Sequence, residues 1–195
     1  MRSSYRANRY GPLFAALVRT HRPRNVVEFG CLEGYSTHHI LRALEANGGS
    51  FEFRVFDLFE DYPFRHAEYA KLVRLFPEVR FTRADYYGSA GLFEDGSIDL
   101  LHIDVSNTAD TFRTFVSDYF RKLKNGGIAI LEGGSAERDE VAWMVAYGKP
   151  RIAPFLAGLR GRHEFVVIEA FPSVTLFRRV EPAATGREID PEHSR

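Results

Sequence analysis

The chain has 195 residues, enough for one domain with a full hydrophobic core, and hydrophobic residues make up 45% of it. Its 26 Lys and Arg residues balance its 26 Asp and Glu residues, which argues against a nucleic-acid-binding protein because such proteins usually carry a basic excess. Cys31 is the one cysteine, and no segment approaches the roughly 20 apolar residues of a membrane span. We therefore expect a cytoplasmic protein that binds neither membranes nor nucleic acid.

Helix-like and strand-like segments alternate along most of the chain. The helix-like segments repeat apolar residues every three to four positions, whereas the strand-like segments are short, apolar and bounded by turn residues. In chain order we expect a helix over 11–21, a strand over 25–30, a helix over 36–49, a strand over 51–59, a helix over 63–76, strands over 79–85 and 97–104, a helix over 108–127, a strand over 128–134, a helix over 137–148, and strands over 164–171 and 173–180.

Proline and glycine residues mark several of these helix ends. Pro12 and Pro63 suit the first turn of a helix, where the missing backbone N–H costs nothing. Gly48 is a typical helix stop, and Asn125-Gly126-Gly127 is expected to end the helix over 108–127.

The order of these segments predicts an α/β fold. Strands that alternate with helices form a parallel, doubly wound sheet of the Rossmann-like kind, here with seven strands. Pro172-Ser173 is too short to connect parallel strands, so the last two strands should form a C-terminal antiparallel hairpin. We expect one domain over residues 1–180 and a disordered tail over 181–195, which has mixed charge and no apolar pattern.

Acidic residues end each of the first five expected strands: Glu28, Asp57, Asp85, Asp104 and Glu132. Ligands of such sheets bind at the carboxyl ends of the strands. Each acid alone could serve a turn or cap a helix, since Asp is common at both positions. Five like charges at one edge repel one another, however, unless a cationic or donor-rich group lies among them.

The first strand ends in a glycine loop, "GCLEG", over residues 30–34. Gly30 and Gly34 can serve a tight turn or let a ligand lie against the backbone. Their spacing is not the G-x-G-x-x-G of a dinucleotide site, no phosphate-binding Walker pattern is present, and Glu33 in the loop would repel a diphosphate. A ligand with ribose hydroxyls for Asp57 and a positive centre fits these residues better.

The stretch "VVEFGCLEGYST" resembles motif I of class I S-adenosylmethionine-dependent methyltransferases, E/D-x-G-x-x-x-G-x-S/T. The resemblance runs from Val26 to about Val180, because the later strand ends and the terminal hairpin occur in the family's order. "LHID" and "LKNGG" are most similar to the small-molecule O-methyltransferase branch that includes macrocin-type enzymes.

The resemblance implies S-adenosylmethionine as the cofactor. Gly30 and Gly34 would let it approach the backbone, Asp57 would accept its ribose hydroxyls, and Asp104 would lie near the sulfonium. Ser36 would contact the ligand carboxylate or simply cap the helix that it opens. The residues implied in cofactor binding are Glu28 beneath the ligand, Gly30, Cys31, Gly34, Ser36, Asp57, Asp85 and Tyr86 beside the adenine, and Asp104.

Two schemes for catalysis follow, with Asp104 and His102 as the candidate catalytic residues. In the first, Asp104 and Glu132 hold a Mg²⁺ ion that acidifies a substrate hydroxyl. The resemblance implies a third ligand directly after the second acid, where this chain has Gly133; Asn107 or Asp110 would have to substitute. In the second, His102, two residues before Asp104, is the base. The other interpretation of His102, which we favour, is a hydrogen-bonded core histidine.

The segment over 133–163 is too long for a simple connection and is expected to be a substrate-side insertion. It contains Trp143, which suits core packing or a substrate platform, together with Tyr147, Lys149 and Arg151. The insertion and the N-terminal helix could also pair two copies into a homodimer.

The sequence thus predicts an S-adenosylmethionine-dependent methyltransferase that acts on a small molecule, at a hydroxyl oxygen. The alternatives are N-methylation and a binding module that keeps the cofactor but not catalysis. A nicotinamide oxidoreductase is disfavoured by G-x-x-x-G. A nucleobase methyltransferase is disfavoured because "DVSN" stands where an N-P-P-Y-type loop would follow the fourth strand.

Overall fold

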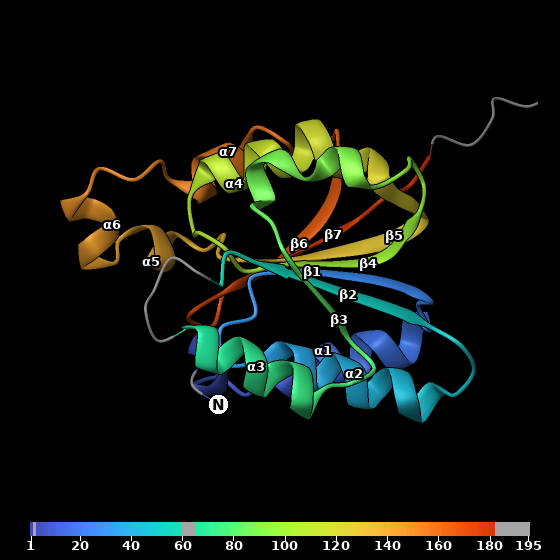
Figure 1. Ribbon diagram of the computed structural model, residues 1–195. Helices are drawn as coiled ribbons and strands as arrows, with labels where there is room; N and C mark the ends of the chain where they lie inside the picture. The colour runs from blue at the N-terminus through green and yellow to red at the C-terminus, as the bar shows by residue number, and fades with distance from the viewer. Residues whose placement is uncertain (2, 60–64, 182–195) are drawn as a thin grey trace, which may run out of the picture.

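A mixed sheet lies at the centre of the computed structural model, which describes residues 1, 3–59 and 65–181 (Figure 1). Within those residues seven strands form the sheet, in the order β3-β2-β1-β4-β5-β7-β6. The strands are β1 (Asn25–Phe29), β2 (Glu52–Asp57), β3 (Arg80–Arg83), β4 (Ile98–Ile103), β5 (Leu123–Glu132), β6 (Glu164–Ile168) and β7 (Val174–Arg178). The first five strands are parallel, and β7 runs antiparallel to both β5 and β6. The predicted fold class, with its terminal hairpin, is confirmed.

Helices cover both faces of the sheet (Figure 1). Those on one face are α1 (Tyr10–His21), α2 (Tyr35–Asn47) and α3 (Arg65–Leu75). The opposite face carries α4 (Ala109–Thr114), which continues as a π-helical turn (Phe115–Tyr119) and a 3₁₀ turn (Phe120–Lys122), and α7 (Ile152–Ala157). The short helices α5 (Ala136–Asp139) and α6 (Ala142–Ala146) project beyond one end of the sheet (Figure 1). Pro63 and the tail from residue 182 lie outside the described residues.

Two hydrophobic clusters follow from the alternation of side chains along each strand. Val26, Leu100 and Ile130 point toward α1 and α2, where Phe14 and Ile40 are completely buried. Their neighbours in the strands point the other way, and the apolar residues packed on that side are Val27, Leu101, Ala129, Phe112 of α4 and Leu156 of α7. Both faces of the central strands are buried, which explains why these strands read as continuous apolar runs.

The same alternation of side chains places several polar residues on one face of the sheet, the face toward α1 and α2. Glu28, His102 and Glu132 each lie two residues beyond an apolar residue that faces α1 and α2, so they share this face. Asp104 follows the end of β4, and its backbone N–H donates to the Phe29 carbonyl at 2.8 Å. It therefore prolongs the strand and lies next to Glu132 in register. The parallel pairing of β1, β4 and β5 assembles three acids and one histidine at one place.

The predicted helix over 108–127 ends earlier than expected. Helical structure stops at Lys122, and Asn125-Gly126-Gly127 lies within β5. Ile98 pairs with Leu123 whereas Leu100 pairs with Ile128, so these residues form an irregularity in the strand. Gly126 adopts a left-handed φ of 81°, a conformation that the irregularity requires and that glycine supplies at little cost. The glycines therefore bend a strand, a role that sequence periodicity does not distinguish from a helix stop.

The predicted helix over 137–148 is also wrong in detail. It is broken into α5 and α6, and α7 follows as an element that the sequence did not predict. Asp139, the last residue of α5, is buried and accepts hydrogen bonds from the backbone N–H groups of Ile152 (2.9 Å) and Ala153 (2.8 Å). This side chain caps α7 from a distant helix, so tertiary contact overrides the local helical pattern.

No helix among the described residues combines the length and the apolar character needed to cross a membrane.

Gly30 provides a test of how β1 and β4 pack. Its φ is 80°, and a β-carbon added there would lie 2.1 Å from the carbonyl oxygen of Asp104. We expect Gly30→Ala to lower the free energy of unfolding by about 2 kcal/mol or more, measured by urea denaturation, because neither backbone can yield easily. Gly91→Ala is the matched control, since a β-carbon there meets nothing within 4 Å. Equal stabilities of the two variants would contradict the close approach.

Candidate functional site

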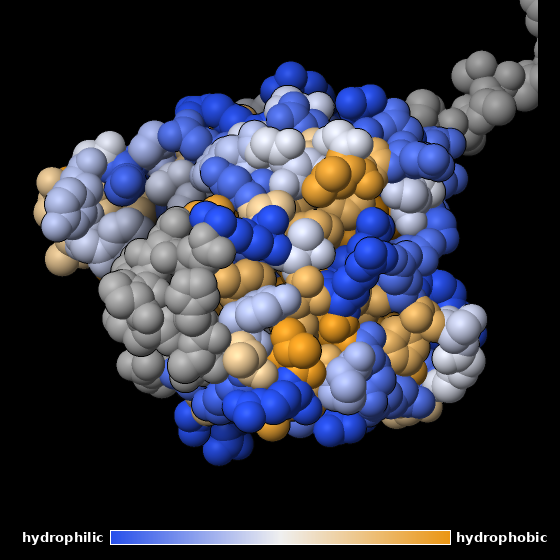
Figure 2. Space-filling view, in the orientation of Figure 1, coloured by the Kyte–Doolittle hydropathy of each residue, from blue (hydrophilic) through white to orange (hydrophobic). Residues whose placement is uncertain are grey.

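A cavity of about 730 Å³ opens at the carboxyl ends of β1, β2, β3 and β4. Figure 2 shows hydrophobic residues reaching the surface across the middle of one face, between the two helix layers, with hydrophilic residues around them. Among the described residues, the sequence-predicted cofactor residues that line the cavity are Gly30, Cys31, Ser36, Asp57, Asp85, Tyr86 and Asp104. Glu28 and Gly34 do not line it. The structure therefore brings most of the predicted residues to one concave site.

Asp57 holds the glycine loop against β2. Its Oδ2 atom accepts a hydrogen bond from the backbone N–H of Cys31 at 2.9 Å. The N–H of Gly30 donates to the Phe56 carbonyl at 2.8 Å, which fixes the neighbouring peptide to the same strand. Asp57 thus lines the cavity, and one of its oxygens also accepts a hydrogen bond from the glycine loop. The sequence did not predict this hydrogen bond.

The two glycines are required by protein packing. A β-carbon at Gly34 would lie 2.8 Å from side-chain atoms of both Leu72 and Phe76. A β-carbon at Gly30 would strike the backbone of Asp104. Both positions also have a left-handed φ, which favours glycine. Close approach of a ligand to these glycines stays a prediction, because neighbouring protein atoms already explain why no side chain stands there.

Glu28 lies at the centre of a buried polar network. Its carboxylate accepts hydrogen bonds from Ser36 Oγ, from Thr37 Oγ1 at 2.6 Å and from His102 Nδ1 at 3.0 Å. The other ring nitrogen, Nε2, lies 3.2 Å from the Tyr5 hydroxyl. In the tautomer in which Nδ1–H donates a hydrogen bond to Glu28, Nε2 accepts one from the Tyr5 hydroxyl, so each ring nitrogen has a partner.

This network corrects two interpretations of the sequence. His102 is completely buried and does not line the cavity, so it is not placed to take a proton directly from a substrate. It is the hydrogen-bonded core histidine of the alternative reading. Ser36 does not cap its helix either: α2 has Gly34 at its N-cap, and the Ser36 hydroxyl is turned to Glu28.

Asp104 and Glu132 form a hydrogen-bonded carboxylate pair where β4 and β5 end. Burial raises the pKa of Asp104 well above its usual range, and the charge and hydrogen bond of Glu132 add to this effect. The Arg138 guanidinium opposes it, without outweighing burial. Burial and the same two carboxylates also raise the pKa of the Tyr5 hydroxyl. Asp104 therefore retains its proton to a higher pH than an ordinary aspartate.

The donor set at this pair does not fit the proposed Mg²⁺ ion. No group of three or more His, Cys, Asp or Glu side chains in the described part of the chain is arranged to hold a metal. The carbonyl oxygen of Gly133 accepts from Thr175 Oγ1 at 2.8 Å. Asp110 is paired with Arg113 at 2.5 Å on the protein surface. Mg²⁺ can bind through one or two carboxylates together with water. Asp104 and Glu132, however, are hydrogen-bonded to each other and lie beside the Arg138 guanidinium, so their oxygens already have partners in the protein.

The two residues predicted to lie beside the adenine, Asp85 and Tyr86, line the cavity and also have hydrogen-bond partners within the protein. Asp85 accepts from the backbone N–H of Tyr87 at 3.1 Å and so caps the turn that follows β3. Tyr86 is buried, stacks on Tyr119 at a centroid distance of 4.8 Å and donates to the Thr111 carbonyl. Tyr87, which the sequence analysis did not select, is 47% exposed and also lines the cavity. The conformation of the turn decides which of these two adjacent tyrosines is buried in the core. The spacing of residues in the sequence therefore could not predict that Tyr86 is buried and Tyr87 is exposed.

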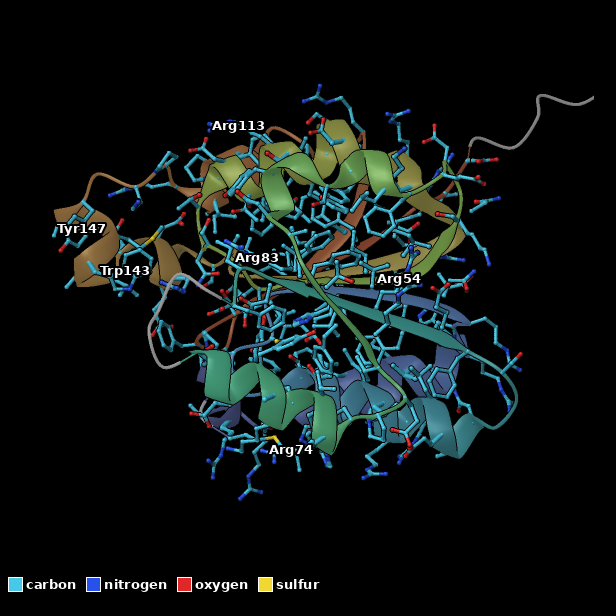
Figure 3. All side chains as sticks on the ribbon, in the orientation of Figure 1. Arg54, Arg74, Arg83, Arg113, Trp143 and Tyr147 are labelled. Atoms are coloured by element: carbon cyan, nitrogen blue, oxygen red, sulfur yellow. The ribbon has the colours of Figure 1, made fainter. Side chains whose placement is uncertain are left out.

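A second cavity of about 400 Å³ adjoins the first, and Tyr87 and Ser106 line both. Three residues of the predicted insertion, Trp143, Lys149 and Pro150, form part of its wall. Trp143 is 40% exposed and also packs against Arg138, whose guanidinium carbon lies 5.1 Å from the ring centroid. Trp143 and Tyr147 lie at α6, at the end of the molecule opposite the point where β7 ends (Figures 1 and 3).

A family model described as a methyltransferase domain matches residues 27–132, more than half of the chain. The chain belongs to this family. The match spans β1 to β5 and so includes the glycine loop, Asp57, Asp85, Asp104 and Glu132. The family that the motif predicted is confirmed.

Solved methyltransferases share the fold at low sequence identity. A methyltransferase from Geobacter sulfurreducens is 20% identical, with 89% of this chain and 79% of that chain covered and a TM-score of 0.61. The Podospora anserina methyltransferase PaMTH1, solved with S-adenosylhomocysteine, is 18% identical, with 93% and 80% covered and a TM-score of 0.67. The O-methyltransferase TomG of Streptomyces achromogenes, solved with S-adenosylmethionine, is 16% identical, with 89% and 80% covered and a TM-score of 0.64. No curated protein sequence matches this chain significantly.

Tyr5→Phe tests the buried network of this methyltransferase. Removing the hydroxyl leaves His102 Nε2 without its partner inside the protein. We expect the free energy of unfolding to fall by about 1–3 kcal/mol in urea denaturation. Tyr147→Phe is the control, because Tyr147 is 76% exposed and its change should stay within about 0.5 kcal/mol. Equal stability of Tyr5→Phe and the wild type would show that this hydrogen bond is not a stabilising contact.

Asp104→Asn tests the carboxylate pair through pH. Because the pKa of Asp104 is raised in the folded protein, the folded state keeps a proton that the unfolded chain releases above about pH 4. Stability should therefore fall as pH rises from about 4 through the raised pKa. The Asp104→Asn variant cannot titrate and should lose less over this window. Unfolding free energies at a series of pH values measure both slopes, and Glu94→Gln, at an exposed site, should keep the wild-type slope.

Proposed function

We propose that this methyltransferase transfers the methyl group of S-adenosylmethionine to a hydroxyl oxygen of a small molecule. The observation that carries the proposal is the cavity at the strand ends, where Asp57, Asp85 and Asp104 meet the glycine loop without any phosphate-binding pattern. Family membership supports methyl transfer. Support for the cofactor comes from PaMTH1 and TomG, which were solved with S-adenosylhomocysteine and S-adenosylmethionine, and TomG is an O-methyltransferase of tomaymycin synthesis.

In this proposal each wall of the first cavity receives one part of the cofactor. Asp57 accepts the ribose hydroxyls, while Asp85 and Tyr87 lie beside the adenine. The first turn of α2 faces the amino-acid end, because unpaired backbone N–H groups at a helix N-terminus favour a carboxylate. Asp104 lies at the sulfonium end. Glu28 acts through Ser36, to which it is bonded, and not by direct contact.

Methyl transfer is an in-line displacement, in which alignment of the two reactants can contribute roughly 7–11 kcal/mol. The acceptor hydroxyl must also lose its proton. Asp104 is the proposed base, since it lines the cavity and a carboxylate with a raised pKa is a stronger proton acceptor in its ionised form. It acts as the base in the fraction of molecules in which it is ionised. His102 is not assigned this role because it is enclosed by Glu28 and Tyr5. Mg²⁺ takes no part in the proposed steps.

The second cavity is the proposed acceptor site. It adjoins the cofactor cavity through Tyr87 and Ser106, and the insertion over 133–163 supplies Trp143 and Lys149. In this proposal the insertion forms the substrate-binding side of a single domain over residues 1–180.

We further propose that the protein acts in the cytoplasm, does not bind nucleic acid, and forms a homodimer. Zero net charge supports the absence of nucleic acid, and exposed Val145 and Tyr147 on the insertion support pairing, which light scattering would measure.

Binding of S-adenosylhomocysteine to the purified protein, measured by calorimetry, tests the proposal. Asp57→Ala should weaken binding about 10- to 100-fold, since it removes charge-assisted hydrogen bonds to the ribose. Glu94→Ala, which removes an exposed acid elsewhere, should bind as the wild type does. Absence of binding by the wild type would overturn the function, and unchanged affinity in Asp57→Ala would overturn the ribose role.

Mass spectrometry of a panel of hydroxyl and amine acceptors separates the alternatives. Methylated hydroxyl products support the proposal. Products from amines alone would favour N-methylation, and bound cofactor without any product would favour a non-catalytic binding module. Asp104→Asn should lower the rate on a hydroxyl acceptor by about 100-fold or more, because general-base contributions are typically of that size.

A further inference from the structure

Arg138 is a buried cation beside the carboxylate pair. Its side chain is 5% exposed, and its Nε atom lies 3.9 Å from Glu132 Oε1. The rings of Trp143 and Phe171 lie 5.1 and 5.8 Å from its guanidinium carbon and hold it in place. Its charge also acts on Asp104. Arg138 therefore lies where the ends of β4 and β5 meet the insertion.

The guanidinium of Arg138 is held in place mainly by electrostatic attraction. Nε and Nη1 are buried and have no hydrogen-bond partner among the described residues. Leaving buried donors unpaired is unfavourable, so hydrogen bonds alone would not hold an arginine here. The neighbouring carboxylates supply the compensating attraction, because opposite charges interact strongly where water is excluded.

Ile152, with the stem of Arg138 beside it, occupies the space where a third metal ligand would stand. A β-carbon at Gly133 would lie 4.0 Å from Arg138 Cγ and 2.7 Å from Ile152 Cδ1. A side chain after Glu132 would therefore collide with Ile152 and lie against the stem of Arg138. The guanidinium charge, with Nε 3.9 Å from Glu132 Oε1, offsets negative charge of the two carboxylates and so weakens their attraction for a divalent cation.

We propose that Arg138 takes the place of a divalent metal ion at the Asp104–Glu132 pair, so that this methyltransferase works without a metal. Arg138 is a positioning residue: its charge holds the two carboxylates together at the edge of the cofactor cavity. The chemical meaning of this inference rests on the proposed function, but its test needs neither cofactor nor acceptor.

Titration of the full-length protein with MnCl₂, followed by calorimetry and thermal unfolding, tests this inference. The wild type should show no saturable binding and no shift in Tm. Arg138→Met, which keeps an apolar stem between the two rings, should bind one Mn²⁺ per chain. At a Mn²⁺ concentration ten times Kd, the ratio of folded to unfolded protein should rise about elevenfold. Glu132→Gln added to Arg138→Met should abolish this gain.

Arg138→Lys is the matched control, because it keeps the positive charge and should exclude Mn²⁺ as the wild type does. One-to-one binding by the wild type that Glu132→Gln removes would overturn the inference. Equal Mn²⁺ binding by the Arg138→Lys and Arg138→Met variants would also overturn it, as would the absence of Mn²⁺ binding by a folded Arg138→Met variant. Either result would show that the charge of Arg138 is not what excludes the metal ion. Arg138→Gln replaces Arg138→Met if the latter does not fold. Loss of S-adenosylhomocysteine binding would bear on the proposed function alone.

Discussion

The parallel pairing of β1, β4 and β5 is the constraint on which the site depends. Pairing in register, together with the alternation of side chains, puts Glu28, His102, Asp104 and Glu132 on one side of the sheet at its carboxyl end. Charged groups so close together in the interior are costly unless they are paired or protonated. The protein meets this cost with two local solutions. The first is the hydrogen-bonded network of Glu28, and the second is the hydrogen-bonded pair of Asp104 and Glu132, in which the pKa of Asp104 is raised and Arg138 lies alongside.

The two groups of residues have different roles, one structural and the other chemical. The Glu28 network is enclosed, since His102, Thr37 and Tyr5 are completely buried, and it ties the N-terminal segment to the sheet. Ser36 connects this network with the wall of the cofactor cavity. Asp104, by contrast, lines the cavity and carries a raised pKa, which is the combination a base requires. His102 at the end of β4 and Asp104 just after it thus have different roles, because Tyr5 of the N-terminal segment encloses His102 whereas Asp104 faces the cavity.

The glycine loop shows how one feature can satisfy packing and binding together. Gly30 lets the backbones of β1 and β4 approach, and Gly34 gives room to Leu72 of α3 and to Phe76, which follows α3. The same compact loop presents Cys31 to Asp57. A loop so closely packed keeps its shape without a ligand, and a preformed site loses less conformational entropy when a ligand binds.

Residue order and local chemistry were enough to determine the fold class, the strand-end acids, the glycine loop and the family. These features depend on periodicity and spacing, which a linear sequence carries directly. Only the tertiary structure decided which acids face the cavity, that His102 is enclosed, that Tyr87 and not Tyr86 is exposed, and that Arg138 joins the carboxylate pair. Arg138 and Asp139 act on residues outside their own helix, through Glu132 and through the start of α7. Such contacts arise only when distant segments pack together, because burial, charge and steric exclusion are properties of the assembled fold.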